Sequence, residues 1–518
     1  MSAAALQESI EPATGAVLGS VPATAPEDVA LAVEEAAAVQ PLWAQLRLAD
    51  RARYLRRAAQ ALIDERRELV ELIAREQGRP VAEAELMEVL PAIETLLWLA
   101  EQGPRTLGEH RVGLSRTFFL RKRVRVTHEP LGVIAVITPA SEPLAVPLGD
   151  VAIALLGGNG VVLKPAALAC LTGQRVARAF TRAGLPEGLL QVVHGGSKTG
   201  RALVDAPVAH VRLTGSAEAG RAAGERAARA LRPSTLALSG KDAALVLGDA
   251  PLPRAIAGVT WGAFANAGQA GGSIERAFVL RERHDAFLAG VVERAAALRV
   301  GDPLDPSTEV GPLTSADRVA RVRELVEDAV ARGATLHCGG ARGEAWFAPA
   351  VLTGVPFDAP LAREEVPGPV LTVDAVDSID EAIRLANEGG FGLGASVWTT
   401  DRAAGARIAR ALHAGMVWMN DHQVSAMAPQ LPWGGVKDSG LGRTRGEPAL
   451  LECVTDKVVT WDTPNGRPLW WHPYDRTLTR AGEALTLLRS VRDRDRSRAW
   501  REGALPLARL AARALRRR

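Results

Sequence analysis

HVRLTGSAEAGRAAGERAARAL, residues 210–231, decides the fold class. A short apolar segment leads into Gly215-Ser216, and a helical pattern follows with Gly220 on its first turn. A glycine turn into a helix exposes unpaired N–H groups at the positive end of the helix dipole, which suits a phosphate. Taken alone, the motif fits an ordinary strand–helix turn equally well.

The neighbouring segments repeat this alternation. Short, wholly apolar, β-branched runs indicate strands, and Ala/Arg-rich segments between them indicate helices. The expected strands are LGVIAVIT (131–138), GVVLKP (160–165), LLQVVHG (189–195) and HVRLTG (210–215); the expected helices are 169–183, 197–204 and 217–231. Strands that are apolar on both faces and alternate with helices predict an α/β fold with a parallel sheet covered on both sides.

The flanking sequence continues the alternation. Helical patterns fill 27–77 and 80–103, and TFFLRKRVRVTH (117–128) alternates basic and apolar residues like a two-stranded ribbon with one wet face. The later expected elements are a strand in ALSGKDAALVLG, a helix at 251–268, a strand near 277–281, helices at 283–298 and 316–332, and a helix with a final strand in 447–462.

Bulk composition limits the function classes. The chain has 518 residues, of which 47% are apolar, so more than one domain is expected. A formal net charge of only +3 argues against a general nucleic-acid binder. Three widely spaced cysteines, Cys170, Cys338 and Cys453, predict neither a disulfide framework nor a metal site, and they favour a cytoplasmic location. The sequence predicts no signal peptide and no transmembrane helix.

Residues 466–518 have a different charge balance. They hold 14 arginines against five acids, and ALPLARLAARALRRR places Leu507, Leu510 and Leu515 near one helical face. A basic amphipathic helix of this kind can lie on an anionic membrane or on a partner protein. A solvated, frayed end is the alternative interpretation.

Seven motifs identify a resemblance. They occur in the order EPLGVIAVITP, GGNGVVLKPA, GLPEGLLQVVHG, LTGSAEAG, REEVPGPVL, GMVWMN and LPWGGVKDSGLGRTRG. This order and spacing resemble the aldehyde dehydrogenase superfamily over about residues 10–462. The long basic tail resembles that of some bacterial succinate-semialdehyde dehydrogenases.

The resemblance implies a domain plan. A Rossmann-like dinucleotide-binding domain would comprise 1–116 and 131–237, and an α/β catalytic-type domain 238–446. A small β oligomerisation ribbon would use 117–130 and 447–464, with a basic tail at 465–518. A homodimer or tetramer is implied, and mixing with an active homologue is a further hypothesis.

The resemblance also assigns cofactor contacts. Lys164 would bind the adenosine ribose of NAD or NADP, Gly195 would lie near the adenine, and Glu365 would hold the nicotinamide ribose. Gly215 and Ser216, with Gly220 on the same helix, would meet the pyrophosphate. The alternative interpretation is that Lys164 and Glu365 are a solvated pair of surface charges without a cofactor role.

Two departures from the family pattern predict weaker cofactor binding. An acidic residue usually follows the lysine by three positions, and here Ala167 stands there. An aromatic residue is usual near the nicotinamide end, where this chain has Pro367. The choice between NAD and NADP stays open, because Ala167 supplies no cation for a 2′-phosphate.

The catalytic positions of the family are all changed. The resemblance places its cysteine nucleophile at Gly271, its glutamate base at Ala237 and its oxyanion-stabilising asparagine at Ser141. Glycine cannot attack a carbonyl, and without a thiolate the base and the oxyanion donor have no covalent route to assist. Ser273 is a substitute nucleophile only if a base accompanies it, and Cys170 and Cys338 lie far away in sequence.

Three hypotheses follow from these losses. The first is a non-catalytic structural or regulatory homologue, a pseudoenzyme that retains the fold and dinucleotide binding. The second is an NAD(P)-dependent oxidoreductase that acts on an aldehyde or oxo group, for example a hydrated aldehyde, without a cysteine. The third is a membrane or partner-binding role for residues 466–518.

Overall fold

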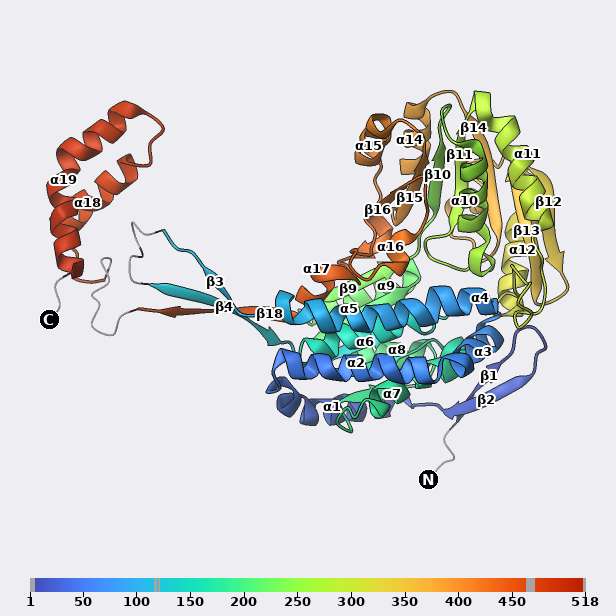
Figure 1. Cartoon of the computed structure of the whole chain (residues 1–518), viewed down its shortest axis with the longest axis horizontal. Coiled ribbons are helices and arrows are strands. Elements are labelled where there is room, and N and C mark those ends of the chain that lie inside the picture. The colour runs from blue at the N-terminus through green and yellow to red at the C-terminus, as the bar shows by residue number, and fades with distance from the viewer. Residues whose placement is uncertain (1–4, 116–118, 120–121, 463–470, 516–518) are drawn as a thin grey trace. The chain divides into compact units, whose positions relative to one another are not determined.

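The computed structural model describes residues 5–115, 119, 122–462 and 471–515 (Figure 1). By compactness the chain divides into two units. The first comprises Met1–Gly108 with His128–Thr455, and the second comprises Glu109–Thr127 with Asp456–Arg518. The predicted boundaries of the dinucleotide and catalytic domains inside the first unit stay a prediction.

The first large sheet of the first unit has six strands in the order β17-β9-β8-β5-β6-β7. All of its neighbouring pairs are parallel except β17 with β9. The strands are β5 (Val133–Ile137), β6 (Gly160–Lys164), β7 (Leu190–Val192), β8 (His210–Gly215), β9 (Ser234–Leu238) and β17 (Gly440–Leu441). β5, β6 and β8 match the predicted apolar strands, and β7 is shorter than predicted. The side chains of β5 and β6 are buried on both faces. β9 and β17 were not predicted.

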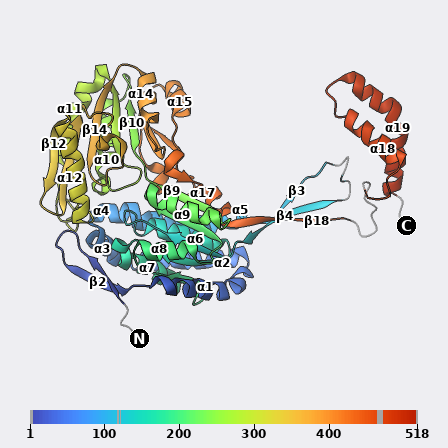
Figure 2. The same cartoon turned by 180° about the vertical axis from the view of Figure 1, so that it is seen from behind.

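Helices cover both faces of this sheet (Figure 2). Ile134 and Val136 of β5 face one apolar core with α2, α5, α6 and α7, whereas Val133 and Ala135 face another with α1, α8 and α9. The helices are α1 (Val29–Ala44), α2 (Leu48–Asp64), α3 (Arg66–Gln77), α4 (Val81–Glu83), η2 (Ala84–Val89), α5 (Leu90–Thr106), α6 (Ala145–Leu156), α7 (Cys170–Arg182), α8 (Ser197–Asp205), α9 (Ala217–Arg229) and α17 (Gly446–Leu451). A separate hairpin pairs β1 (Leu6–Ile10) with β2 (Val17–Pro22).

The second large sheet has seven strands in the order β12-β13-β14-β11-β10-β15-β16, and only β12 with β13 is antiparallel. The strands are β10 (Asp242–Val246), β11 (Ile274–Leu280), β12 (Thr335–Arg342), β13 (Trp346–Thr353), β14 (Val370–Val376), β15 (Gly394–Trp398) and β16 (Met416–Met419). Its helices are α10 (Leu252–Phe264), α11 (Arg281–Ala297), α12 (Ala316–Ala331), α13 (Pro360–Arg363), α14 (Ile379–Asn387), α15 (Arg402–Ala411) and α16 (Val424–Met427).

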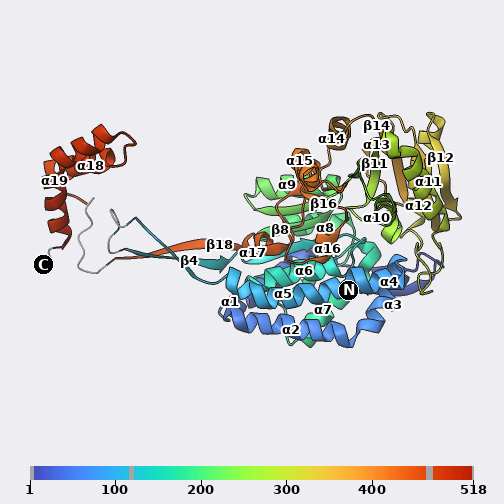
Figure 3. The ribbon, with the colours of Figure 1, turned by 45° about the horizontal axis from the view of Figure 1, so that its top comes forward.

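The second unit contains a three-stranded sheet and two helices (Figure 3). In this sheet β4 (Arg123–Pro130) lies between β18 (Val454–Trp461) and β3 (His110–Val112). Helices α18 (Arg476–Leu487) and α19 (Asp493–Leu515) lie side by side in all three views. We refer to these two helices as the C-terminal hairpin.

The ribbon differs from its prediction. The sequence predicted two strands within 117–128, part of which lies outside the described residues. In the described part, β4 pairs with β3 at 110–112 and with the final strand β18. The alternation of RKRVRVTH correctly indicates one strand. Its partner β3 is a nearby segment without a comparable pattern, and its partner β18 lies in the 447–464 segment that the resemblance grouped with this ribbon.

A search for membrane-spanning segments among the described residues finds no helix that combines the length and hydropathy needed to cross a bilayer.

Candidate functional site

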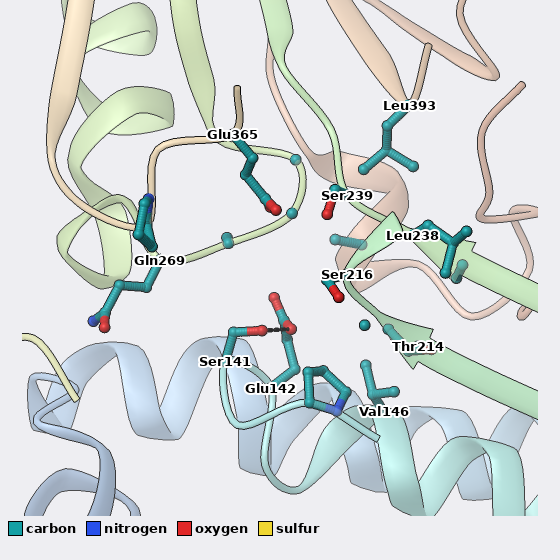
Figure 4. A pocket seen from close by; sticks show the side chains of 18 of the residues that line it. Ser141, Glu142, Val146, Thr214, Ser216, Leu238, Ser239, Gln269, Glu365 and Leu393 are labelled. Atoms are coloured by element: carbon teal, nitrogen blue, oxygen red, sulfur yellow. Dashed lines mark hydrogen bonds between the residues drawn. The ribbon is translucent and has the colours of Figure 1, made fainter. Parts of the chain in front are cut away.

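One pocket in the first unit gathers most of the predicted site residues (Figure 4). It has a cavity volume of about 210 Å³. Its lining includes all three changed catalytic positions, Ser141, Ala237 and Gly271, together with Gly215, Ser216 and Glu365. Four of the seven motifs therefore contribute residues to one cavity, whereas Lys164, Gly195 and Gly220 are not in its lining.

The pocket lies at the carboxyl edge of the first sheet. The chain adds β6 and β7 on one side of β5, then crosses to add β8 and β9 on the other side. Ile137, at the end of β5, pairs with Lys164 of β6 and with Leu213 of β8. A reversal of strand order opens a crevice at the carboxyl ends of parallel strands, where such folds bind ligands.

The N-terminus of α9 faces this crevice. The Ser216 side chain caps the helix by accepting a hydrogen bond from the Ala219 N–H at 3.2 Å. The Ala217 N–H donates to the Ser239 hydroxyl at 3.3 Å. Ser239 stands where the resemblance expects glycine, so it engages one of the N–H groups that an anion would otherwise receive.

Gly220 acts through packing. A Cβ added at this position would lie 2.3 Å from Cδ2 of Leu238 on β9. The glycine therefore allows α9 to approach β9 closely, which places the helix N-terminus beside the pocket. Its predicted role in meeting the pyrophosphate is not tested by this packing.

Lys164 is buried at the end of β6 and has no carboxylate partner among the described residues. Its Nζ donates to the Pro165 carbonyl at 3.1 Å, and burial lowers the pKa of its ammonium to about 8. Gly195 follows β7 with φ of +153°, and a Cβ there would lie 2.2 Å from the Thr199 hydroxyl. Gly195 therefore needs to be glycine for backbone reasons as well as for any contact with a ligand.

Glu365 is held by contacts on both sides of its own backbone. Lys241 donates to the Glu364 carbonyl at 2.6 Å and forms a buried ion pair with Glu275. Glu275 accepts the Val366 N–H at 3.2 Å. Burial raises the pKa of Glu365 to about 7, and its side chain points into the cavity. Glu365 is therefore not the solvated surface residue of the alternative interpretation.

The loop that carries Gly271 keeps a constrained shape. Asn266 and Ala267 adopt left-handed φ of 52° and 51°, and Glu83 accepts the Asn266 N–H at 2.8 Å. Gly268 lies so close to Gly368 that a Cβ would meet its carbonyl oxygen at 2.3 Å. Such strain persists only where the surroundings hold it. The loop conformation is thus well determined, while its tip carries no functional side chain.

The other two changed positions lack the chemistry expected there. Ala237 presents only a methyl group on β9 and is 4% exposed. The Ser141 hydroxyl donates to the Glu142 carboxylate, and the Ser141 carbonyl accepts from Arg79 at 2.9 Å. In Figure 4 Ser141, Glu142 and Glu365 are directed into the same cavity.

Neither Ser273 nor any of the described cysteines lines the pocket as a substitute nucleophile. Ser273 is buried and donates to the carbonyls of Gly262 and Ala263 at 3.2 Å, so it serves the end of α10. None of the three cysteines, all of which are described, lines the cavity. Burial raises the pKa of the Cys170 and Cys338 thiols and raises that of Cys453 to about 11, which disfavours thiolates.

Sequence reasoning missed three charged lining residues. Glu142 directly follows Ser141, and Arg445 lies in the LPWGGVKDSGLGRTRG motif, but neither received a role. Arg318 lies in none of the motifs. The guanidinium groups of Arg318 and Arg445 lie close enough to the Glu142 carboxylate for a favourable electrostatic interaction. Arg445 also stacks over the Trp433 ring at 6.0 Å from its centroid. Glu142 and Arg445 could have been found from the sequence because they lie beside or within segments that were already considered, whereas Arg318 gave no such signal.

The model of the aldehyde dehydrogenase family matches residues 2–459. The chain belongs to the aldehyde dehydrogenase family. This confirms both the suspected superfamily and the predicted α/β fold with Rossmann-like parallel sheets.

Individual relatives agree with this assignment. The chain is 35% identical over 472 residues to a 4,4'-diapolycopene aldehyde oxidase from Methylomonas sp, covering 90% of this chain and 88% of the relative. It is 37% identical over 454 residues to a betaine aldehyde dehydrogenase from Cereibacter sphaeroides, covering 87% and 92%. A crystal structure of Mycobacterium tuberculosis aldehyde dehydrogenase complexed with NAD+ superposes with a TM-score of 0.84 at 34% identity, covering 88% and 95%.

The residues present fit a nicotinamide dinucleotide. Lys164, a buried ammonium without a carboxylate partner among the described residues, ends strand β6 of the first sheet. Ser216 at a helix N-terminus and the carboxylate of Glu365 line the pocket. These groups suit ribose hydroxyls, a pyrophosphate and a second ribose in turn. Ser216 and Glu365 thus share one pocket with the three changed catalytic positions Gly271, Ala237 and Ser141.

Proposed function

We propose that this aldehyde dehydrogenase family protein binds a nicotinamide dinucleotide and does not carry out thiol-dependent aldehyde oxidation. A structural or regulatory role then follows, as in a pseudoenzyme. One observation carries the proposal: the pocket combines Gly271, Ala237 and Ser141, and none of the three cysteines lines it.

The chemistry of aldehyde oxidation supports this proposal. Hydride leaves a carbonyl carbon readily only after a nucleophile has added and an oxyanion has formed. A positioned general base contributes about 10²–10⁴ in rate, and one oxyanion donor contributes about 10²–10³. These contributions are not additive once the nucleophile is absent, because they assist the covalent step. Losing the thiol is therefore decisive.

Dinucleotide binding is supported by the retained Lys164, Ser216 and Glu365 and by the NAD+ complex of the mycobacterial relative. We propose that the affinity is weakened. Ala167 offers no carboxylate beside Lys164, and Pro367 replaces an aromatic side chain in the pocket lining. Ser239 adds a third cause, since it engages the Ala217 N–H at the start of α9.

Calorimetric titration of the full chain with NAD, NADP and their reduced forms tests the first half of the proposal. A saturable heat with at least one form is expected, and no heat with any form would contradict cofactor binding. For the second half, aldehyde turnover is followed by the absorbance of reduced nicotinamide, before and after alkylation with iodoacetamide. Turnover that alkylation abolishes would overturn the proposal.

The Ser141–Glu142 pair favours a second candidate function. An aldehyde hydrate carries its own oxyanion precursor and needs no protein nucleophile. Glu142 would take a proton from one hydroxyl of the hydrate as the C–H bond breaks, leaving a carboxylic acid, with Ser141 orienting the carboxylate. A bound oxidised nicotinamide would accept the hydride.

Glu142→Gln tests this second function, with Glu218→Gln as the matched control. Glu218 lies on α9 near the pocket but is exposed and does not line it. Thiol-independent turnover should fall by about 10² in Glu142→Gln, the lower end for a positioned base. Calorimetric dinucleotide affinity should stay unchanged in both variants. Equal turnover in the two variants would reject a base at Glu142.

A further inference from the structure

The C-terminal hairpin is strongly basic. Residues 471–515 contain ten arginines, five acids and no lysine, and the sequence has three more arginines at 516–518, outside the described residues. Arginine is the side chain best suited to phosphate groups, because its planar guanidinium donates two parallel hydrogen bonds. The charge surplus alone does not identify a partner, so the arrangement of the side chains matters.

The two helices bury their small apolar residues against each other. Ala481 and Ala484 of α18 and Ala499 of α19 are at most 3% exposed, and Leu510 is 6% exposed. Gly503 approaches so closely that a Cβ would lie 2.0 Å from Cβ of Ala484. One side of α19 is therefore occupied inside the hairpin, and Leu510 belongs to it.

The opposite side of α19 mixes arginine with apolar groups. At about 100° per residue, Arg501 lies nearly opposite Ala499 and Gly503, and Leu505 lies about 40° from Arg501. Arg509 and Trp500 lie on the two flanks of this side. Leu505 is 60% exposed, and Trp500 at the edge of this side is 62% exposed. At the start of the hairpin Trp471 is 65% exposed.

Several of these arginines have no acidic partner in the described chain. Ion pairs join Arg494 to Asp495, Arg496 to Asp493, Arg498 to Glu502 and Arg513 to Asp475. Six others are exposed with no acid within 4.0 Å among the described residues: Arg476, Arg480, Arg489, Arg492, Arg501 and Arg509. Their charge is available to an external anion.

We propose that the C-terminal hairpin binds the surface of a membrane that carries anionic phospholipids. Guanidiniums would contact the headgroup phosphates, and Trp500 with Leu505 would enter the boundary between headgroups and acyl chains. Tryptophan favours that boundary, and a helix that combines arginine with Trp and Leu is typical of interfacial binding. The absence of a membrane-spanning helix among the described residues agrees with contact at the surface only. A nucleic acid would use the arginines but would leave Leu505 exposed.

Vesicle co-sedimentation of the full-length protein tests the proposal. We expect binding to phosphatidylcholine vesicles that contain phosphatidylglycerol, little binding to phosphatidylcholine alone, and weaker binding as salt rises. Each arginine near an anionic surface changes the partition coefficient by about fivefold. Arg501→Gln/Arg509→Gln should therefore lower it by about 25-fold. Trp500→Ala should lower it as well, and that loss should persist at high salt.

Arg402→Gln/Arg407→Gln is the matched control. Both arginines are exposed on α15 of the first unit, without an ion pair among the described residues, so the net charge changes equally. This control should bind like the unmodified protein, and all variants should keep the same thermal transition. Equal loss in the control, or no binding by the unmodified protein, would overturn the proposal. Retention on single-stranded RNA without vesicle binding would also overturn it and assign the hairpin to another polyanion.

Discussion

At Gly271, the pocket has room for the side chain that the family normally carries there. A Cβ at this position would have only Cδ2 of Leu393 nearby, at an ordinary 3.7 Å, and the backbone is not left-handed. Gly240, which packs behind the same loop, is different, because a Cβ there would lie 2.3 Å from the Gly271 carbonyl oxygen. The absence of the nucleophile is thus a property of one residue and not of a collapsed site.

Gly271→Cys should accordingly fold normally and expose a thiol that iodoacetamide alkylates, measured by intact mass. Adding Ala237→Glu and Ser141→Asn should raise aldehyde oxidation by at least about 10² over the single variant, because a base and an oxyanion donor then assist the thiolate. Gly240→Cys is the control and should lower the melting temperature. A triple variant without any turnover would show that the pocket has lost more than these three side chains.

Glu365 predicts a pH dependence of dinucleotide affinity. Because burial raises its pKa to about 7, the side chain is protonated and neutral below that pH and ionised above it. Only the carboxylate can accept hydrogen bonds from both hydroxyls of a ribose. NAD affinity should therefore rise by about tenfold from pH 6 to pH 8, following the ionised fraction. Calorimetry at several pH values measures this, and Glu365→Gln should show a flat profile.

Among elements, the contact between α9 and β9 fixes the phosphate-facing end of the pocket. Gly220 permits the contact, whereas Gly224, one turn later, leaves 3.1 Å to the flexible end of Leu236. The motif LTGSAEAG predicts the helix and the turn that precedes it. The glycine at position 220 is required by Leu238 on β9, which lies too close for a larger side chain. Local pattern thus predicts the element, and only packing explains the residue.

Gly220→Ala should destabilise the protein by about 1–3 kcal/mol, since the added methyl overlaps Leu238 in a filled core. Gly224→Ala should stay within about 1 kcal/mol of the unmodified protein, because better helix propensity offsets a mild contact. Urea denaturation followed by circular dichroism measures both. Equal effects would mean that α9 can shift away from β9 without loss.

Several strands were not predicted from the sequence. The hairpin of β1 with β2, the antiparallel pair β12 with β13, and strands β14 to β16 were not predicted. β12 and β16 lie at the two edges of the second sheet, where burial on only one side gives a weaker apolar pattern. The central strands β5, β6 and β10 are buried almost throughout, and their uniform apolar sequences allowed them to be predicted as strands.

For the whole molecule, the pocket and the C-terminal hairpin belong to different compact units. Every residue that lines the pocket lies between Pro139 and Arg445, and none comes from the hairpin. Removing residues 463–518 should therefore leave dinucleotide affinity unchanged while abolishing vesicle binding. Calorimetry and co-sedimentation on the same truncated sample measure the two properties. Loss of both would indicate that the units depend on each other.

The expected homodimer or tetramer, and its mixing with an active homologue, stay predictions at this scale. Light scattering of the pure protein measures the mass, and co-purification with a tagged active relative measures mixing. The sheet of β18, β4 and β3 is the surface that the family resemblance implicates, and Val458 on β18 is 62% exposed.

The linear sequence determined the family, most strands of the first parallel sheet and the residue types at the three catalytic positions of the family, because each depends on short motifs whose residues are adjacent in the chain. It could not determine that Ser239 engages an N–H of α9, that Glu142, Arg318 and Arg445 share the pocket, or that Leu510 is buried within the hairpin. Those facts depend on distances between residues up to hundreds of positions apart. Such distances exist only after the sheets have formed and the helices have packed against them.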